Sequence, residues 1–225
     1  MKSILKYNVP IPRIIIIALG VAFLLDCNSL LAQHDFPKDS AEWRVWYWNT
    51  GIPRASYLQT FSYTTDSLFL GTQYKVIECS CNPFLLLFRY DSIAKQAFFV
   101  SDKFRGLGIY QDSTEYLLYD FSKTIGDTIE VIGPNLDTIR YWVTQDGMTT
   151  VGTQTRRYID VARLYFSTVV IDRWYEGIGS DIGLLAPVLE PSGSFEQNWA
   201  LVCFKNLGNG FTHEPHPIFD CNTPV

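Results

Sequence analysis

The chain has 225 residues, of which 15% are aromatic and 18% are charged, and its formal net charge at pH 7 is −5. An aromatic-rich chain with so few charges is typical of an ordered globular protein and excludes extensive disorder. The acidic balance would be repelled by the phosphates of nucleic acid, so we expect no nucleic-acid partner.

The first 32 residues predict a signal peptide. Met1–Arg13 carries three basic residues and no acidic one, and Ile14–Leu25 is an unbroken apolar run of 12 residues. That length matches a signal-peptide core and is well short of the roughly 20 residues that span a bilayer. Cleavage is predicted near Ala32, and no membrane span is expected. The mature protein is therefore expected to be secreted, periplasmic or attached to the cell surface.

Two other interpretations of this segment stay open. An uncleaved anchor would need a longer apolar stretch than the one present. Lipidation at Cys27 is the stronger alternative, because Leu24-Leu25-Asp26-Cys27 resembles a loose lipobox. Asp26 argues against it, since such sites favour a small neutral residue directly before the cysteine.

Residues 33–225 are expected to form a single all-β domain. Removing residues 1–32 leaves 15 basic and 22 acidic residues, a net charge of −7. About 190 residues suit one domain with an ample core. The predicted domain is thus acidic and large enough to fold by burial of its apolar side chains.

Short extended segments separated by turn residues run along the whole mature chain, and no helical period of 3.6 residues interrupts them. Such spacing predicts an antiparallel all-β fold, a sandwich or a barrel-like sheet of about 12 short strands. Asp146-Gly147 is interpreted as the tip of a hairpin between Thr138–Thr144 and Thr149–Val151. The other expected strands are Trp43–Trp48, Ser56–Tyr63, Asp66–Leu70, Gln73–Cys79, Phe84–Tyr90, Ala97–Ser101, Leu107–Tyr110, Tyr116–Phe121, Ile129–Ile132, Arg156–Val161, Leu164–Val170 and Ala200–Lys205.

Four cysteines remain in the mature chain, and export makes disulfides the default expectation for them. Cys203 and Cys221 bracket a loop that contains glycine and proline and could bring them together. Cys79 and Cys81 share a face if they lie on one strand, with Cα atoms about 6.6–6.8 Å apart, at the limit of disulfide reach. We favour 203–221 with 79–81, and the other two connectivities and a thiolate metal site stay as alternatives.

Four stretches, taken together, resemble a group of uncharacterised secreted all-β proteins of Bacteroidota. The most specific is Trp174–Ser180 (WYEGIGS) with Gly183-Leu184, and the other three are Asp66–Lys75, Leu117–Phe121 with Gly126–Thr128, and Leu201–Lys205. The resemblance implies an envelope or secreted location and supplies no catalytic residues. Larger members of the group continue into a secretion-system sorting domain, a tail that we do not expect here.

The glycine-rich stretch Glu176–Gly183 is interpreted as a structural loop. It departs from the dinucleotide pattern G-x-G-x-x-G and from the nucleophile-elbow pattern G-x-S-x-G. We expect its glycines to adopt positive φ and Trp174 to pack beneath it. The alternative is a sugar or cation contact through Glu176 or Asp181.

The only histidine cluster is His213-Glu214-Pro215-His216, with Asp220 nearby. Pro215 makes a helical turn unfavourable, so the histidines would not share a face. We expect a solvated loop, with a metal site as the alternative. No catalytic, cofactor-binding or metal-binding residue is nominated, and no cofactor is expected.

The tryptophans are the remaining candidates for a ligand surface. Aromatic side chains pack β cores, and exposed aromatics on a sheet also stack on sugars. The favoured hypothesis is a non-catalytic, exported binding or interaction module of the cell envelope, with a glycan or an envelope protein as its partner. The alternative is a glycosidase-like hydrolase on a β scaffold. Core packing is the favoured interpretation of the tryptophans, and a possible ligand surface made of Trp43, Trp46, Trp48, Trp174, Glu176 and Asp181 stays as the alternative.

Overall fold

The computed structural model describes residues 35–49, 55–80, 82–100, 114–133, 136–165, 168–188, 197–208, 210–215 and 221. The chain divides into two units, Met1–Gln33 and His34–Val225. The predicted signal peptide, with Cys27 and Ala32, lies outside the described residues, as does the expected strand Leu107–Tyr110. Among the described residues, no helix has the length and apolar character needed to cross a membrane.

The second unit is built from antiparallel strands, and the all-β prediction is confirmed. Thirteen strands form within the described residues, and no helix does. Their bounds are β1 Ala41–Asn49, β2 Ala55–Phe69, β3 Thr72–Cys79, β4 Asn82–Asp91, β5 Gln96–Val100, β6 Glu115–Asp120, β7 Thr128–Ile132, β8 Thr138–Val151, β9 Gln154–Tyr165, β10 Thr168–Tyr175, β11 Gly179–Ser180, β12 Gln197–Asn206 and β13 Phe211–His213.

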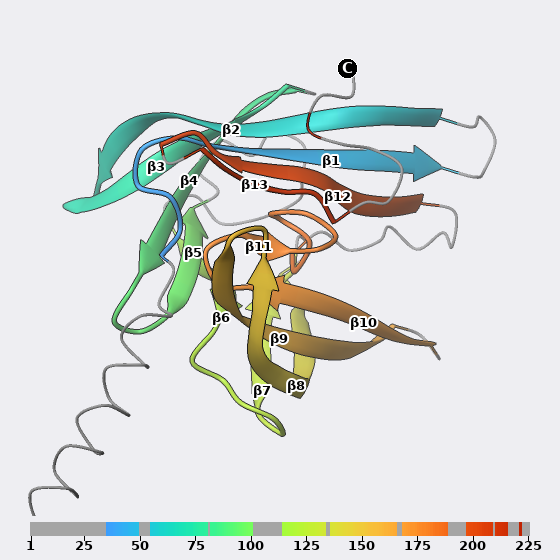
Figure 1. Ribbon diagram of the computed structural model, residues 1–225. Coiled ribbons are helices and arrows are strands. Elements are labelled where there is room, and N and C mark those ends of the chain that lie inside the picture. Colours follow the sequence, from blue (N-terminus) through green and yellow to red (C-terminus); the bar gives the residue numbers. More distant parts are fainter. Residues whose placement is uncertain are drawn as a thin grey trace, which may run out of the picture. The chain divides into compact units, whose positions relative to one another are not determined.

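Two sheets contain these strands (Figure 1). The first sheet has eight strands in the order β13-β12-β1-β2-β3-β4-β5-β6. The second has five, in the order β11-β10-β9-β8-β7. Consecutive strands therefore pair as meanders, and the main exception is β12, which returns to pair with β1.

Alternation in the sequence decides which side of a strand enters the core. In β1, Trp43, Val45 and Tyr47 are buried, whereas the residues between them are only half-buried. Trp43 lies against Tyr63 of β2, with ring centroids 5.2 Å apart. In the second sheet, Trp174 packs edge-on against Tyr119 of the first sheet at 5.0 Å. Aromatic side chains from both sheets thus form one shared core.

The prediction of a hairpin at Asp146-Gly147 is wrong. Strand β8 runs through both residues, with a register shift between Val143 and Gln145, and pairs with β9 up to Val151. Gly147 lies opposite Tyr158, and a Cβ placed on it would lie 3.2 Å from the Tyr158 ring. This glycine therefore allows the close approach of an aromatic ring, a role that glycine has inside strands, and does not form a turn.

Two other expected strand boundaries also differ from those in the structure. The expected strands Ser56–Tyr63 and Asp66–Leu70 are one strand, β2, because an irregularity between Tyr63 and Thr65 keeps the pairing with β3 intact. The expected strand Leu164–Val170 is divided between β9 and β10, which pair with each other there. Short apolar runs predict extended backbone but do not show where the chain reverses.

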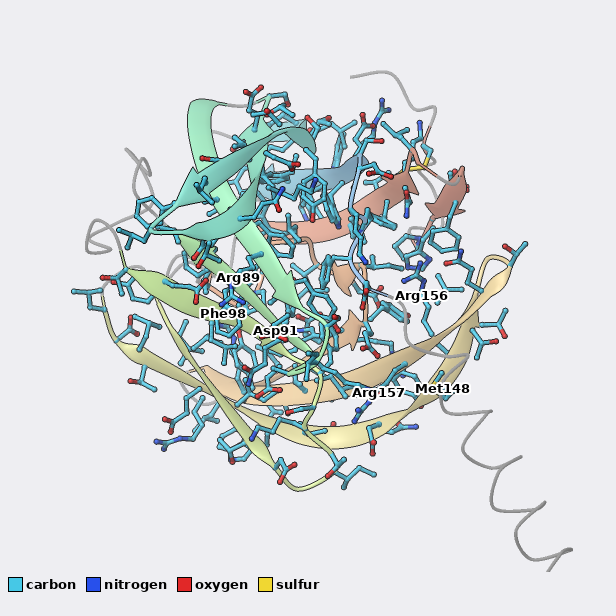
Figure 2. All side chains as sticks on the ribbon, turned by 90° about the vertical axis from the view of Figure 1, so that its left-hand side faces the viewer. Arg89, Asp91, Phe98, Met148, Arg156 and Arg157 are labelled. Atoms are coloured by element: carbon cyan, nitrogen blue, oxygen red, sulfur yellow. A yellow bond between two sulfur atoms is a disulfide. The ribbon has the colours of Figure 1, made fainter. Side chains whose placement is uncertain are left out.

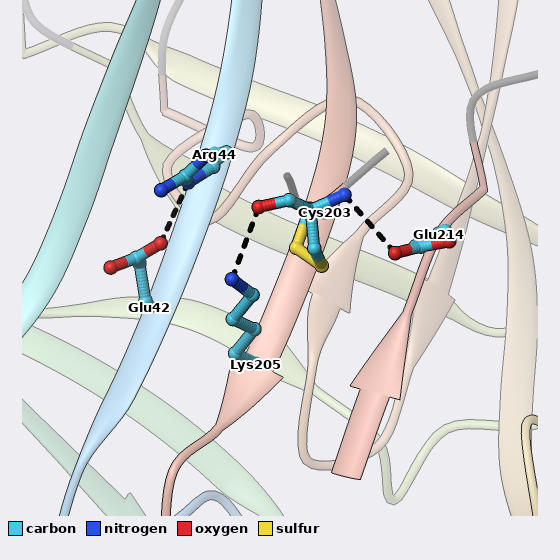
Figure 3. The surroundings of a disulfide bond; sticks show 6 residues. Glu42, Arg44, Cys203, Lys205 and Glu214 are labelled. Carbon is cyan, nitrogen blue, oxygen red and sulfur yellow. Dashed lines mark hydrogen bonds and ion pairs between the residues drawn. A yellow bond between two sulfur atoms is a disulfide. The ribbon is translucent and has the colours of Figure 1, made fainter. Parts of the chain in front are cut away.

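The disulfide between Cys203 and Cys221 is present, as predicted, with Cα atoms 5.1 Å apart. Cys79 is also disulfide-bonded, and its expected partner Cys81 lies outside the described residues. Figure 3 shows the hydrogen bonds beside the first bridge, where the Lys205 ammonium donates to the Cys221 carbonyl at 3.1 Å and the Cys221 N–H donates to Glu214 at 3.0 Å. The bridge thus attaches Cys221 to the strand β12.

Candidate functional site

A cavity of about 410 Å³ lies between the segment 35–39 and the strands β2, β3 and β4. That volume is within the range of about 300–1,000 Å³ typical of small-ligand sites. Phe36 anchors the segment, since its ring lies 5.0 Å from that of Phe88 and 5.2 Å from that of Tyr90. One wall of the cavity is therefore held in place by an aromatic contact with the sheet that forms the other wall.

Tyrosines supply much of the aromatic lining. Tyr63, Tyr74 and Tyr90 line the cavity, each from a different strand. The Tyr63 hydroxyl is buried and has no hydrogen-bond partner within the described part of the chain. Burial raises the pKa of Tyr63 well above its usual value, so the group is a neutral hydroxyl at all physiological pH values. Tyr63 thus lines the cavity, whereas its unpaired hydroxyl oxygen is itself enclosed by protein atoms.

Each cation that lines the cavity already faces a carboxylate. The Lys75 ammonium lies 2.5 Å from Asp66, which also accepts a bond of 3.2 Å from the Gln73 amide. The Lys38 ammonium lies 3.6 Å from Asp35. This pairing leaves no concentrated positive charge in the cavity, a charge that a phosphate or sulfate ligand would require.

Arg89 is held most firmly. Its guanidinium donates two bonds to Glu115, at 2.8 and 2.6 Å, and lies 4.4 Å from the centre of the Phe98 ring and 3.8 Å from Asp91 (Figure 2). Tyr74 donates to the same carboxylate at 2.7 Å. Burial alone would raise the pKa of Glu115, but the bonds from Arg89 and Tyr74 lower it below its usual value. The Glu115 carboxylate therefore stays charged and holds Tyr74, which lines the cavity, in place.

Behind the cavity, Tyr90 connects its lining to a buried carboxyl group. The Tyr90 hydroxyl donates to Glu176 Oε1 at 2.9 Å, while Oε2 of Glu176 has no partner among the described residues. Burial raises the pKa of Glu176, and the bond from Tyr90 opposes this shift. Glu176 is only 1% exposed and does not line the cavity. A ligand in the cavity would thus contact Tyr90 and not Glu176.

The stretch around Glu176 is a structural element, as predicted. Gly177, Gly179 and Gly183 all have positive φ, and Trp174 is fully buried. The Ser180 hydroxyl donates to the buried Asp172 at 2.8 Å. The element also joins the sheets, because the Trp43 indole donates to the Ile178 carbonyl at 2.7 Å.

The possible ligand surface does not form as one surface. Trp43 and Trp174 are buried in the core, which agrees with the favoured interpretation, and Glu176 is buried as well, so a ligand contact by these three residues is corrected. Trp46 is half-buried and packs against the cluster of Leu58, Val202, Cys203 and Cys221, and Trp48 is half-buried on the same strand. Where aromatic residues occupy both faces of a strand, the local sequence does not show which face a second sheet covers.

The histidine cluster is not a solvated loop at its first residue. His213 belongs to β13, its ring lies edge-on to Tyr175 at 5.3 Å, and its Nε2 is 3.8 Å from Asp181. His216 and Asp220 lie outside the described residues. In the part of the chain that the structure describes, no three metal-ligating side chains gather. Pairing of β13 with β12, which no local pattern predicts, places His213 in the sheet.

None of these cavity residues is among the predicted site residues. Tyr63 and Tyr90 lie in expected strands without a predicted role, because tyrosines are common in β cores, and Gln73 begins another expected strand. The available signal was a departure from alternation at Thr64, where an irregularity in β2 changes the direction of the following side chains. Comparison with known proteins adds no further constraint, because no family model, curated protein or solved structure matches this chain.

Proposed function

We propose that this protein is an exported, non-catalytic binding module of the cell envelope and that its cavity holds a neutral glycan. The observation that carries the proposal is Tyr63, a residue that lines the cavity and whose buried hydroxyl has no partner among the described residues. An unpaired buried hydroxyl costs about 1–3 kcal/mol. A hydroxyl group of a sugar would remove that cost by accepting from or donating to it.

The charge pattern of the cavity supports a neutral, polyhydroxylated ligand. The lining carries both signs of charge, with Lys75 and Lys38 each paired to a carboxylate. The Gln73 amide and the Asp66 carboxylate can still accept or donate further bonds at the surface. Polar groups of both kinds beside aromatic rings are the combination that orients and covers a sugar ring.

Export is part of the same proposal. The disulfide Cys203–Cys221 is compatible with an extracellular or periplasmic location, since such bonds persist in oxidising compartments. The predicted signal peptide and the resemblance to secreted proteins of Bacteroidota favour that location. Cleavage near Ala32 would place the segment 35–39, one wall of the cavity, close to the mature N-terminus.

A hydrolase remains the alternative, and the raised pKa of Glu176 is the observation that favours it. A carboxyl group with a raised pKa is what a general acid requires. Glu176 is closed off from the cavity by Tyr90, however, so it does not reach a substrate bound there. Binding without catalysis therefore agrees better with the geometry.

The proposal is tested by binding of the mature protein to an oligosaccharide array, followed by titration calorimetry with the best-binding sugar. Tyr63→Phe removes only the hydroxyl and should weaken binding about threefold to tenfold, the value of one neutral hydrogen bond. Tyr57→Phe is the matched control, because Tyr57 is also on β2 but is exposed and does not line the cavity. The control should bind as the natural protein does.

Two outcomes would contradict the proposal. Equal affinity of the natural protein and Tyr63→Phe would exclude this hydroxyl from the site, and an array without any bound sugar would exclude the glycan. Release of reducing ends from the bound sugar would show catalysis and favour the hydrolase.

A further inference from the structure

The strand β10 has an open edge over part of its length. Along one edge it pairs with β9 from Thr168 to Tyr175, and along the other it pairs with β11 only at Trp174 and Tyr175. The Arg173 carbonyl also accepts from Asp181 at 2.9 Å. No hydrogen bond to a described residue covers this second edge before Arg173.

The register shows which backbone groups point to the open edge. The Glu176 N–H donates to the Arg157 carbonyl on β9, and in an antiparallel pair such bonds recur at every second residue. Val170 therefore directs its N–H and C=O toward β9. Val169 and Ile171 direct theirs to the opposite edge, where they have no partner within the described residues.

The same two residues present apolar side chains to solvent. Val169 is 59% exposed and Ile171 is 67% exposed. Both lie on the face of the sheet that also carries the exposed Leu164, which pairs with Val169, and the exposed Trp142 of β8. We call Trp142, Leu164, Val169 and Ile171 the outer apolar patch. An apolar patch that reaches an unpaired strand edge is a common interaction surface.

We propose that two copies of this chain associate through β10, antiparallel and about a two-fold axis at Val170. In this register Val169 of one copy pairs with Ile171 of the other, and Ile171 with Val169. Each of these is a hydrogen-bonded pair, so the contact forms four backbone hydrogen bonds and satisfies every open group named above. The two five-stranded sheets join into one, and the two outer apolar patches become continuous.

A second copy suits this edge because the edge is complementary to itself. A two-fold axis at Val170 places Val169 of each copy opposite Ile171 of the other. The open N–H and C=O groups of one copy therefore meet the open groups of the second copy. The outward-facing positions 169 and 171 carry no charge, so no like charges meet across the axis. The edge also lacks the lysine, proline and irregularity with which strand edges usually prevent such pairing.

Cysteine cross-linking tests the register. Val170 pairs with itself across the axis, and its Cα atoms would be about 4.5 Å apart, within disulfide reach. Val170→Cys should give a disulfide-linked dimer on mild oxidation. Val169→Cys is the matched control, since its Cα atoms would be about 8 Å apart and out of reach. Cross-linking of the control as fast as Val170→Cys would overturn the register.

Sedimentation equilibrium of the mature protein tests the association itself. We expect a monomer–dimer equilibrium, and Ile171→Lys should weaken it at least about tenfold by placing two ammonium groups across the axis. Ile93→Lys adds the same charge at a residue that is 96% exposed in the turn after β4 and should leave the equilibrium unchanged. A natural protein that stays monomeric at its highest soluble concentration would overturn the proposal and leave the edge to a strand of another protein.

Discussion

The indole N–H of Trp43 on β1 donates to the carbonyl of Ile178, 135 residues later, across 2.7 Å. Trp43 is fully buried, so this bond has no competing water. It ties the first strand of one sheet to the turn that precedes the last strand of the other. The bond makes this residue a direct link between the two layers.

Trp43→Phe should lower the free energy of unfolding by about 2–4 kcal/mol. The change leaves the buried Ile178 carbonyl unpaired and opens a small cavity, and both effects destabilise. Urea unfolding followed by circular dichroism measures it. Trp48→Phe, on the same strand but half-buried, should cost less than about 1 kcal/mol, and equal losses would contradict the role of the bond.

Asp172 should make the protein less stable as the pH rises from about 4 to about 7. Burial raises the pKa of Asp172 to about 7, although bonds from Ser180 and Trp174 oppose the shift. In the unfolded chain the pKa is about 3.9, so the folded state holds the proton more tightly. The stabilisation is complete below about pH 4 and is lost as the pH rises to about 7.

The measurement is chemical unfolding between pH 4 and pH 8. Asp172→Asn cannot ionise, so the decrease of stability with pH, on the order of 4 kcal/mol, should become smaller by a large part of that amount. Asp137→Asn, at an exposed turn, should keep the slope of the natural protein. An unchanged slope in Asp172→Asn would contradict a raised pKa.

Gly179→Ala should destabilise the fold by about 2–3 kcal/mol. Gly179 has a φ of +104°, and a Cβ there would lie 3.0 Å from the Tyr119 hydroxyl. Backbone strain and the clash with a buried ring both contribute. Gly71→Ala separates the two effects, because Gly71 also has positive φ but has open space around it. The control should lose only about 1 kcal/mol in thermal or urea unfolding.

Removal of the Cys203–Cys221 bridge should cost about 3 kcal/mol. The bridge closes a separation of 18 residues, and the chain-entropy model assigns about that value to such a loop. The double variant Cys203→Ser with Cys221→Ser isolates this bridge, whereas a reductant would also act on Cys79. A double variant as stable as the natural protein in urea unfolding would show that Cys221 contributes little to the cluster around Trp46.

Local patterns were sufficient for the fold class and for part of the core. Alternation over residues 43–48 predicts one buried face of β1, and turn residues predict most strand ends, because side-chain direction and backbone preference are properties of neighbouring residues. The bridge between Cys203 and Cys221 was also predictable, since only a short loop separates them. The glycines after Trp174 indicated positive φ, which the backbone confirms.

The local sequence does not show which side chains another strand or sheet covers. Asp146-Gly147 is typical of a turn, yet Gly147 lies within β8 and accommodates the ring of Tyr158 from the next strand. The local sequence around Trp174 and Glu176 is also compatible with contact to a ligand. In the structure Trp174 packs against Tyr119 and Glu176 accepts a bond from Tyr90, and these contacts bury both residues. Local alternation and turn residues therefore predict a β-strand protein with an export signal at its start and a loop near its end that a disulfide closes. Packing between distant segments sets which aromatic side chains enter the core, that Tyr63 lines a cavity and that β10 keeps an open edge, because these features depend on contacts between residues far apart in the chain.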